Sequence, residues 1–385
     1  MKKVASSPAW LRGKKVAIVT DWLTTYGGAE KVVKSVHELF PDAPIFTSQY
    51  SEKEIDWFRD CDVRTGWVNV FPAKLRKILS VFRAIYFSRL HKKLAEYDVI
   101  IIICIAESKG ILLAPHQRGF CYLQGPPTQY FWGMYDEYVK NPGFGIANPI
   151  VRFFFKLLVR PLRRLDYKFA QRPTVLAANS TYSAAESQKY YHRQAEIIFP
   201  PVDIERFVPA SVQGDFFITT SRQVNWKRLD IAIKACRQTG HTLKLVGSGA
   251  EHDALVALAA GDDAIEFVPP IHDPAKLAKL VARAKGFIFP SQEPFGIAPI
   301  EALSAGVPVV AYKKGGALDY IVDGVNGVFF DEQSVDSLVQ AIQRFETLHF
   351  RRKAITASAQ PFSEAAFKRC FMKYIQSGVA VSDDT

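Results

Sequence analysis

The sequence predicts an α/β protein with two doubly wound domains in tandem. A chain of 385 residues is long for one compact core and comfortable for two. Short apolar segments typical of buried strands alternate with segments of helical periodicity, most regularly in the second half. Such alternation is typical of a mostly parallel sheet with helices on both faces. Ligands of these sheets bind at the carboxyl ends of the strands, so we expect a ligand cleft between the two domains.

The first domain is predicted to span residues 1–200. Its first strand, 14–20, runs into a glycine loop and then a helix over about 29–40. The other predicted strands are 97–106, 119–123 and 174–180, and the other helical stretches lie around 72–96 and 149–172. Ser180 or Thr181 is placed to cap the helix after the last strand.

The second domain is predicted to span residues 201–362. The linker between the domains is predicted in the aperiodic, proline-rich stretch 195–214, so the domain boundary falls inside this stretch. Its predicted strands lie near 216–220, 242–247, 264–268, 286–290, 308–312 and 326–330. Its predicted helices lie near 228–238, 250–260, 273–284, 299–305, 316–322 and 334–346. Residues 363–385 are expected to form a C-terminal helix, which packs back toward the first domain, and a tail.

The composition argues against several classes of protein. The five cysteines are scattered and form no Cys-x-x-Cys pair, which argues against a disulfide framework and a zinc site. The longest apolar run, 99–106, is far shorter than the roughly 20 residues of a membrane-spanning helix. No continuous apolar stretch follows the basic N-terminus, so no signal peptide is predicted. We therefore expect a cytoplasmic protein, or one that is peripheral on the inner face of the cell membrane.

The positive charge is concentrated in the first domain. The net charge is +11, and residues 1–200 hold 29 Lys and Arg against 17 Asp and Glu, whereas the remainder is close to neutral. Charge asymmetry of this kind points to an anionic partner of the first domain, which could be a nucleic acid, a membrane or phosphate.

Two segments carry much of this charge. Segment 71–93 has seven basic residues, no acid and apolar residues at helical spacing, and segment 150–164 places five basic residues among aromatic ones. Both are typical of surfaces that bind an anionic bilayer. The alternatives are that the apolar stripe packs on the core, or that the basic face is simply solvated. Nucleic acid is not expected, because no helix-turn-helix, RNP or zinc pattern occurs.

The motif YGGAEK (26–31) places Gly27 and Gly28 between the first strand and its helix. Two glycines let the backbone approach a ligand, and the free N–H groups at a helix start favour phosphate. An ordinary tight turn is the alternative, because a Gly-Gly pair alone is a weak signal.

Arg222 and Lys227, in TSRQVNWKRLD (220–230), follow one predicted strand and precede a helix. Two cations at the carboxyl edge of a sheet can bind a diphosphate, the arginine through its fork and the lysine as a point charge. They would stabilise the charge on a departing nucleoside diphosphate. The alternative is a pair of solvated basic residues in a surface loop.

The stretch SQEPFGIAPIEALSAG (291–306) holds Glu293 and Glu301 with only apolar residues, glycine and proline between them. Pro299 fits the first helical position, which would place Glu301 in the first turn of a helix that ends at Gly306. A helix-dipole role for Glu301 and a solvated loop position for Glu293 are the alternatives, but neither explains the apolar residues between them. The wall of a cleft, with two carboxylates that accept hydrogen bonds from hydroxyls, explains both.

These motifs resemble the retaining glycosyltransferases of the GT-B fold, of the family 4 type. That family includes bacterial mannosyltransferases of O-antigen and exopolysaccharide assembly. Besides the four charged residues, the resemblance rests on DWLTTYGGAEKVV (21–33), NSTYSAAESQKYYHRQAEIIFPPVDIERF (179–207) and AGVPVVAYKKGGALDYIVDGVNGVFF (305–330). It covers nearly the whole chain and is more specific in the second domain than in the first.

The resemblance implies two Rossmann-like domains and a role for each matching residue. Arg222 and Lys227 would bind the donor diphosphate, Glu301 the ribose hydroxyls, and Glu293 the donor sugar. The implied donor-binding residues are Gly27, Gly28, Arg222, Lys227, Glu293, Phe295, Gly296, Ile297 and Glu301, and the implied catalytic residues are Glu293, Arg222 and Lys227. No metal and no cofactor is expected, and no Asp-x-Asp stands at the end of a predicted strand.

One segment departs from the family. Relatives often carry a histidine in a His-Thr-Pro segment followed by an arginine, whereas this chain reads YLQGPPTQYFW (122–132) with Gln124 in the histidine's place. Glutamine cannot act as a base but can hydrogen-bond a sugar hydroxyl, so Gln124 is the acceptor-side candidate. In a retaining front-face reaction the leaving phosphate itself can take the acceptor's proton. The alternative is a plain loop residue in a rearranged segment.

The function implied by the resemblance is metal-independent transfer of a hexose, with mannose from GDP-mannose favoured, onto a lipid-linked or glycan acceptor at the cytoplasmic membrane face. Two other functions stay open. One is another GT-B nucleotide-sugar enzyme such as an epimerase, and the other is a catalytically weak sugar-nucleotide-binding partner protein.

Overall fold

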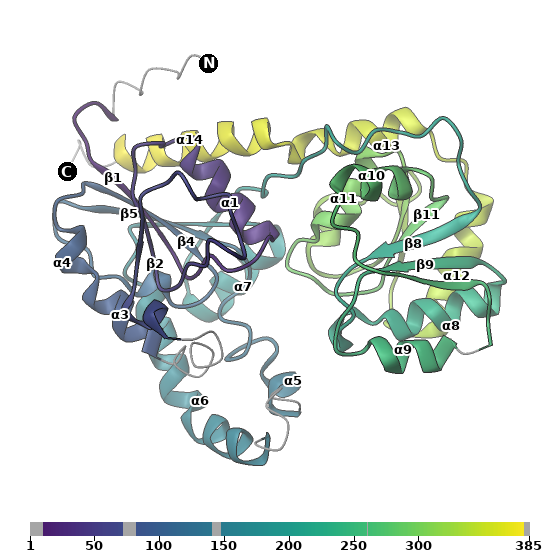
Figure 1. Ribbon diagram of the computed structural model, residues 1–385, viewed down its shortest axis with the longest axis horizontal. Helices are drawn as coiled ribbons and strands as arrows, with labels where there is room; N and C mark the ends of the chain where they lie inside the picture. The colour runs from purple at the N-terminus through teal and green to yellow at the C-terminus, as the bar shows by residue number, and fades with distance from the viewer. Residues whose placement is uncertain (1–10, 72–81, 141–147, 260, 381–385) are drawn as a thin grey trace. The chain divides into compact units, whose positions relative to one another are not determined.

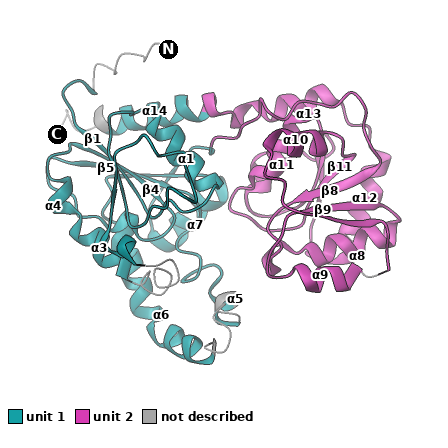
Figure 2. Ribbon diagram, in the orientation of Figure 1, with its two compact units in different colours: residues 1–200, 367–385 teal, residues 201–366 magenta. Residues whose placement is uncertain are grey.

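The computed structural model describes residues 11–71, 82–140, 148–259 and 261–380, and the chain divides into two compact units. The first unit comprises residues 1–200 and 367–385, and the second comprises residues 201–366 (Figure 2). Each unit is built on one parallel sheet between layers of helices, as the sequence predicts (Figure 1).

The sheet of the first unit has the strand order β3-β2-β1-β4-β5-β6-β7. Its strands are β1 (Val16–Thr20), β2 (Ile45–Thr47), β3 (Val63–Thr65), β4 (Val99–Cys104), β5 (Arg118–Leu123), β6 (Val175–Ala178) and β7 (Glu196–Ile197). All neighbouring pairs are parallel. The direction of strand addition reverses between β1 and β4, which is the switch point of a doubly wound sheet.

Strand β4 shows why the apolar runs of this sequence become strands. Val99, Ile101 and Ile103 belong to the core on one face of the sheet, while Ile100 and Ile102 belong to the core on the other. Because alternate side chains point to opposite faces, a strand that is covered on both sides must be apolar throughout.

The helices of the first unit are α1 (Gly28–His37), α3 (Arg83–Arg89), α4 (His91–Leu94), α5 (Tyr135–Lys140), α6 (Asn148–Ala170), α7 (Thr181–Tyr191) and α14 (Glu364–Ala380). Helix α14 returns to this unit from the end of the second, and its Phe367 and Phe371 share a core with Tyr122 of β5. The predicted cap of α7 is confirmed, since Ser180 Oγ accepts the N–H of Ser183 at 3.0 Å.

The sheet of the second unit has the order β10-β9-β8-β11-β12-β13, all parallel, and its switch point lies between β8 and β11. Its strands are β8 (Phe216–Thr220), β9 (Thr242–Val246), β10 (Ile265–Val268), β11 (Gly286–Phe289), β12 (Val309–Tyr312) and β13 (Gly327–Phe330). Its helices are α8 (Leu229–Thr239), α9 (His252–Ala259), α10 (Pro274–Ala282), α11 (Ile297–Ser304), α12 (Val335–Thr347) and α13 (Arg352–Ser358). Helices α8, α9 and α12 lie on one face of the sheet, and α10, α11 and α13 on the other (Figure 1).

Some elements differ from the prediction. Strands β2 and β3 have three residues each and β7 has two, which is too short for a periodic signal, and β7 lies inside the predicted linker. Helix α13 was not predicted, and the helix predicted near 316–322 is a 3-10 helix, Gly315–Asp319. Of the helical stretch predicted at 72–96, residues 72–81 lie outside the described residues, and the rest forms α3 and α4.

A buried charged network joins four segments of the first unit. Asp166 of α6 accepts hydrogen bonds from Thr128 Oγ1 at 2.8 Å, Trp132 Nε1 at 2.8 Å and Tyr191 OH at 2.7 Å. It also forms an ion pair of 2.7 Å with Lys109, whose side chain is fully buried. Burial by itself would lower the pKa of Lys109, but the Asp166 carboxylate, together with Tyr191 and Cys104, raises this pKa well above its ordinary value.

We expect Asp166→Asn to destabilise the first unit by about 3–5 kcal/mol, because it leaves the Lys109 ammonium buried without its counterion. Urea denaturation followed by far-UV circular dichroism measures the loss. Glu96→Gln is the matched control, because Glu96 pairs with Lys15 on the open surface. Equal unfolding midpoints for Asp166→Asn and the control would contradict the assigned role of the buried pair.

Candidate functional site

The topology of the second unit brings the predicted donor residues to one edge of its sheet. Arg222 and Lys227 follow β8, and Glu293 follows β11. These two strands are neighbours at the switch point, where the loops after them diverge and leave room for a ligand. Lys227 and Glu293, which are 66 positions apart in the sequence, are therefore in contact.

Lys227 and Glu293 form the centre of this site. The ammonium of Lys227 is paired with Glu293 Oε1, which also accepts the hydroxyl of Ser291 at 3.0 Å. The Lys227 Nζ atom lies 4.4 Å from the ring centroid of Trp226, and the guanidinium carbon of Arg222 lies 5.9 Å from the same centroid. Lys227 is only 9% exposed, whereas Arg222 is exposed.

The electrostatics of this cluster favour an anion. Burial lowers the pKa of Lys227, the Glu293 carboxylate opposes that shift, and the nearby Arg222 adds to it. The Lys227 ammonium is thus largely removed from water, has the Glu293 carboxylate as its counterion, and lies near a second cation, Arg222. An incoming diphosphate would supply negative charge to both cations.

The turn after β11 is held by the Gly-Gly pair of the KKGGALDY motif. Gly316 donates its N–H to the carbonyl of Glu293 at 2.9 Å. A Cβ atom on Gly315 would lie 2.3 Å from the Glu293 carbonyl oxygen, and one on Gly316 would lie 2.3 Å from Phe295 Cα. Only glycine lets these two backbones approach so closely, so the pair fixes where the Glu293 carboxylate stands.

The start of α11 corrects one prediction. The helix begins at Ile297, so Pro299 is its third residue rather than its first, and Glu301 lies in the second turn. Gly296, with φ +92°, makes the turn that starts the helix early. Pro299 is still tolerated, because the first-turn N–H groups have no partner inside the helix. Because Glu301 is the fifth residue of the helix, it is not an acid of the first turn, and its side chain is half-buried.

The helix end at Gly306 fits the prediction, whereas the donor-binding role of Phe295 stays a prediction. Phe295 is buried, and its carbonyl accepts the hydroxyl of Tyr320 at 3.0 Å. Gly306 follows the C-cap residue Ala305 with φ +74°, the left-handed conformation that often ends a helix.

Sequence reasoning missed Ser221, which follows β8 directly. Its hydroxyl is buried without a hydrogen-bond partner among the described residues. A Cβ atom on Gly247 would lie 2.1 Å from the Ser221 carbonyl, so the loop after β9 also comes to this edge. A buried hydroxyl beside Arg222 is suited to a polar ligand atom. Nothing in the local pattern marks this serine.

The Gly27–Gly28 turn stands where the sequence places it, at the start of α1 in the first unit. The carboxylate of Glu30 folds back to this turn and accepts the hydroxyl of Thr25 at 3.1 Å. A Cβ atom on Gly27 would lie 2.7 Å from Glu30 Oε2, so a larger residue here would displace the end of the Glu30 side chain. Burial raises the pKa of Glu30.

The switch point of the first unit is organised by Asp21, which follows β1. Its buried carboxylate accepts four backbone N–H groups of the loop after β4, at 2.7 to 3.0 Å; they belong to Ile105, Ala106, Glu107 and Ser108. These four hydrogen bonds fix the loop that carries Glu107. The Glu107 carboxylate pairs with Arg83 at 2.9 Å and accepts the Tyr130 hydroxyl at 2.9 Å. Burial raises the pKa of Glu107, against the effect of Arg83. The position of Asp21 directly after a buried strand is the signal that could have found it.

Gln124 stands at the carboxyl end of β5 in the first unit. Its N–H donates to the carbonyl of Cys104 at 2.8 Å, and its carbonyl accepts from Asn179 Nδ2 at 2.7 Å. Its side-chain Nε2 is buried with no partner among the described residues. Because an unpaired buried amide is costly, this donor is suited to a ligand hydroxyl.

No group of three or more His, Cys, Asp or Glu among the described residues could hold a metal ion. Likewise, none of the described helices is both long and apolar enough to cross a membrane.

Comparison with known proteins agrees with this geometry. Residues 202–362 match the family described as "Glycosyl transferases group 1". The D-inositol 3-phosphate glycosyltransferase of Segniliparus rotundus is 28% identical over 223 residues, which are 49% of this chain and 50% of that protein. The chain spans about half the length of the curated relatives it matches.

Two solved structures are similar over nearly their whole length. The lipopolysaccharide outer core galactosyltransferase WaaB has a TM-score of 0.67 at 14% identity, over 94% of this chain and 99% of that one. Anabaena Alr3699/HepE, solved in complex with UDP, has a TM-score of 0.66 at 18% identity, over 94% and 100%. At such low identity these similarities establish the fold alone.

The architecture is therefore that of a GT-B protein, with two Rossmann-like units. The match to the group 1 glycosyl transferases covers nearly all of the second unit, which is less than half of the chain.

The buried Lys227 generates a prediction on pH. Lys227 attracts a diphosphate only in its ammonium form. Because the pKa of Lys227 is lowered, this form is lost at a lower pH than in an ordinary lysine. We expect the affinity for a nucleoside diphosphate to fall as the pH rises through that pKa. Isothermal titration with GDP, or with whichever nucleotide binds, measures the dependence.

Lys227→Arg is the control for this titration, because arginine stays charged and the nucleotide's own titration is common to both proteins. The alkaline loss of affinity should disappear in this variant. An equal loss in wild type and variant would show that Lys227 does not carry the effect.

Proposed function

We propose that the protein is a glycosyltransferase that moves a hexose from a nucleotide sugar to an acceptor with retention of anomeric configuration. One observation carries the proposal. Lys227 and Glu293, beside Arg222, stand at the switch point of a unit that matches the group 1 glycosyl transferases. Two cations and a carboxylate at this place suit the diphosphate and the sugar of one donor molecule.

In the proposed reaction the diphosphate takes the place of Glu293 as the partner of Lys227. Arg222 and Lys227 stabilise the negative charge that grows on the leaving diphosphate. Glu293, released from the ion pair, accepts hydrogen bonds from the sugar hydroxyls. Glu301 holds the ribose, and no metal or cofactor is needed, because the two cations supply the positive charge.

The backbone N–H groups of Phe295, Gly296 and Ile297, at the turn into α11, bind the sugar and a phosphate in this proposal. The start of a helix favours an anion, and this turn is fixed by the Gly315–Gly316 approach. The contribution of Gly27 and Gly28 to the donor site stays a prediction.

Mannose from GDP-mannose is the favoured donor, on the resemblance to bacterial mannosyltransferases. UDP-glucose is the competing candidate, because a crystal structure of the HepE neighbour holds it. The proposed acceptor is a lipid-linked sugar or a glycan at the cytoplasmic face of the membrane. Segments 71–93 and 150–164 are the proposed membrane-facing surfaces, and part of the first lies outside the described residues.

A panel of GDP-, UDP- and ADP-sugars in a thermal-shift assay tests the proposal. The correct donor should raise the unfolding midpoint of the second unit, since a ligand at 100 times its Kd stabilises the folded state by about 2.7 kcal/mol. Arg222→Ala should abolish the shift. If no sugar nucleotide shifts the midpoint, the transferase proposal fails.

Glu293→Gln separates binding from transfer. We expect it to lower the transfer rate by about 100-fold or more, because the neutral amide holds the sugar differently in the transition state. Binding of the free nucleoside diphosphate should stay within a few-fold of wild type. Transfer of label from the identified nucleotide sugar to membrane lipid or glycan gives the rate. Unchanged transfer, with glycan assembly still dependent on the chain, would favour a binding partner without activity.

Gln124→Leu tests the acceptor side. Leucine removes the buried Nε2 donor at similar volume, so we expect the KM for the acceptor to rise while the Kd for the nucleotide stays unchanged. Gln124→His should retain part of the activity, because histidine can also donate a hydrogen bond. Equal acceptor kinetics for Gln124→Leu and wild type would make Gln124 a plain loop residue.

A further inference from the structure

Helix α6 exposes an apolar stripe that nothing in the described structure covers. The stripe residues follow the i, i+3, i+4, i+7, i+8 spacing of one helix face. Their exposed fractions are 64% for Ile150, 65% for Phe153, 52% for Phe154, 62% for Leu157 and 46% for Leu158. A stripe of this spacing ordinarily packs on a core, and here it is the exposed side of the helix.

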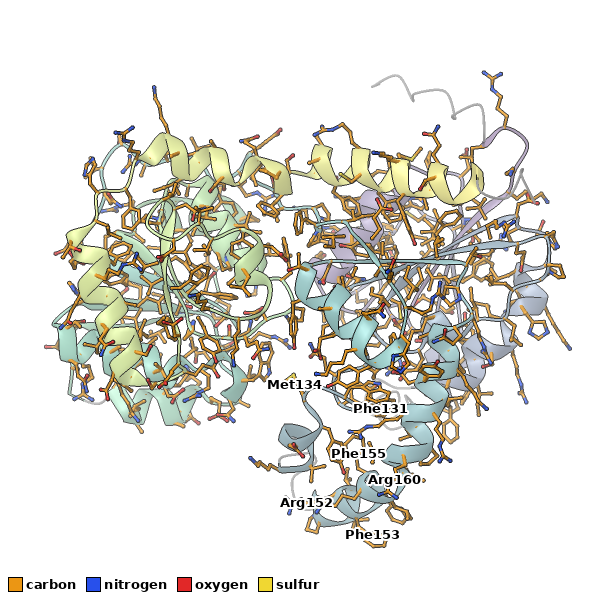
Figure 3. The ribbon with its side chains drawn as sticks, turned by 180° about the vertical axis from the view of Figure 1, so that it is seen from behind. Phe131, Met134, Arg152, Phe153, Phe155 and Arg160 are labelled. Atoms are coloured by element: carbon orange, nitrogen blue, oxygen red, sulfur yellow. The ribbon has the colours of Figure 1, made fainter. Side chains whose placement is uncertain are left out.

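The other side of the same half of α6 is already occupied. Phe155 lies 6.3 Å from the ring of Phe131 and 5.6 Å from that of Tyr135. Arg152 donates to the carbonyls of α5 residues Val139 and Lys140 at 2.7 and 2.8 Å. Figure 3 shows Phe155 and Phe131 toward each other and Phe153 at the outer end of the helix. The stripe is therefore held away from the first unit by contacts on its opposite side.

The charge of α6 is all of one sign near the stripe. Residues 148–165 contain five basic side chains and no acid, and Asp166 is the first acid of the helix. Arg152 and Arg163 bind backbone carbonyls, and Arg163 also stacks over Trp132. Lys156, Arg160 and Arg164 are exposed. An apolar stripe flanked by exposed cations complements a surface that is apolar inside and anionic outside.

The second basic segment behaves differently in its described part. Tyr86, Phe87 and Leu90 are buried in the core, and Arg83 is paired with Glu107. The apolar residues predicted for 71–93 are thus divided over 82–93, since Phe82 and Ile85 remain 42% and 45% exposed. Of the described parts of the two segments, the first half of α6 exposes the larger apolar stripe.

We propose that residues 150–158 of α6 insert into the headgroup and upper acyl region of an anionic bilayer, with Lys156, Arg160 and Arg164 on the lipid phosphates. The inference deepens the proposed function, because it names the partner surface of a transferase with a lipid-linked acceptor. A second copy of the chain is a weaker candidate than a bilayer for covering this stripe. Two such helices face to face would bring cations together with no acid between them.

Vesicle co-sedimentation with the full chain tests the proposal. The probes are vesicles of phosphatidylcholine alone and of equal parts phosphatidylcholine and phosphatidylglycerol. We expect clear binding to the anionic vesicles only. The triple variant Phe153→Gln, Phe154→Gln and Leu157→Gln should weaken that binding by about tenfold or more, because three large apolar side chains are lost from the buried face.

A charge variant tests the second half of the argument. Lys156→Gln with Arg160→Gln should lower the partition onto anionic vesicles by about tenfold and reduce its salt dependence. The matched controls are Val256→Gln, which changes an exposed apolar residue of α9, and Lys276→Gln with Lys279→Gln, which removes two exposed cations of α10. Both controls should bind vesicles like wild type.

Three outcomes would overturn the inference: no binding of wild type to anionic vesicles, equal binding of the triple variant, or a dimer in solution that the triple variant dissociates. The assay contains no sugar nucleotide, so its failure is separate from failure of the proposed transfer. Conversely, the triple variant should bind the donor nucleotide like wild type. A lost thermal shift together with lost vesicle binding would indicate misfolding, and circular dichroism of the variant decides that case.

Discussion

The parallel pairing of β8 with β11 is the constraint on which the candidate donor site depends. In a doubly wound sheet these two strands are adjacent but their loops run apart, so side chains from distant parts of the chain meet at one open edge. Lys227 enters from the first loop and Glu293 from the second. The ion pair between them is partly desolvated, and it holds both charges at the place where a diphosphate and a sugar would need them. The same close approach explains the glycines, since Gly315 and Gly316 carry the backbone that supports the Glu293 turn.

The first unit also has a charged side chain at its switch point, but there the charge holds the protein's own backbone. The Asp21 carboxylate accepts four backbone N–H groups there. It therefore fixes the loop after β4 and is not free for a ligand. Deeper in the same unit, the Lys109–Asp166 network ties the loop that follows Gln124 to α6 and α7. Buried charges of this kind are costly unless every partner is present, and so they fix the loops that carry Gln124 and Glu107.

The long elements could be predicted because their patterns are strong. All six strands of the second sheet and the apolar run of β4 were placed within a residue or two. Most of these strands are buried on both faces and are therefore largely apolar, whereas β9 and β10 include the polar residues Lys244 and Glu266. The charged residues of the donor site were also found, because cations and acids directly after strands are conspicuous. The short strands β2, β3 and β7 were missed, because two or three residues carry no period. The start of α11 was misplaced, because Gly296 rather than Pro299 begins the helix.

The sequence by itself determined the fold class, the strand-loop-helix positions of Arg222, Lys227 and Glu293, and the excess of positive charge in the first half. These follow from local periodicity and composition, which a linear chain displays directly. Only the tertiary structure decided which charges are paired and which are open. The ion pair of Lys227, the unpartnered amide of Gln124 and the saturated Asp21 depend on burial and on contacts between distant segments. The same holds for the two basic segments, whose patterns are alike. Over 82–93 the first segment packs Tyr86, Phe87 and Leu90 in the core. In contrast, α6 exposes its whole stripe, because Phe155 and Arg152 bind the rest of the unit on the opposite side of the helix.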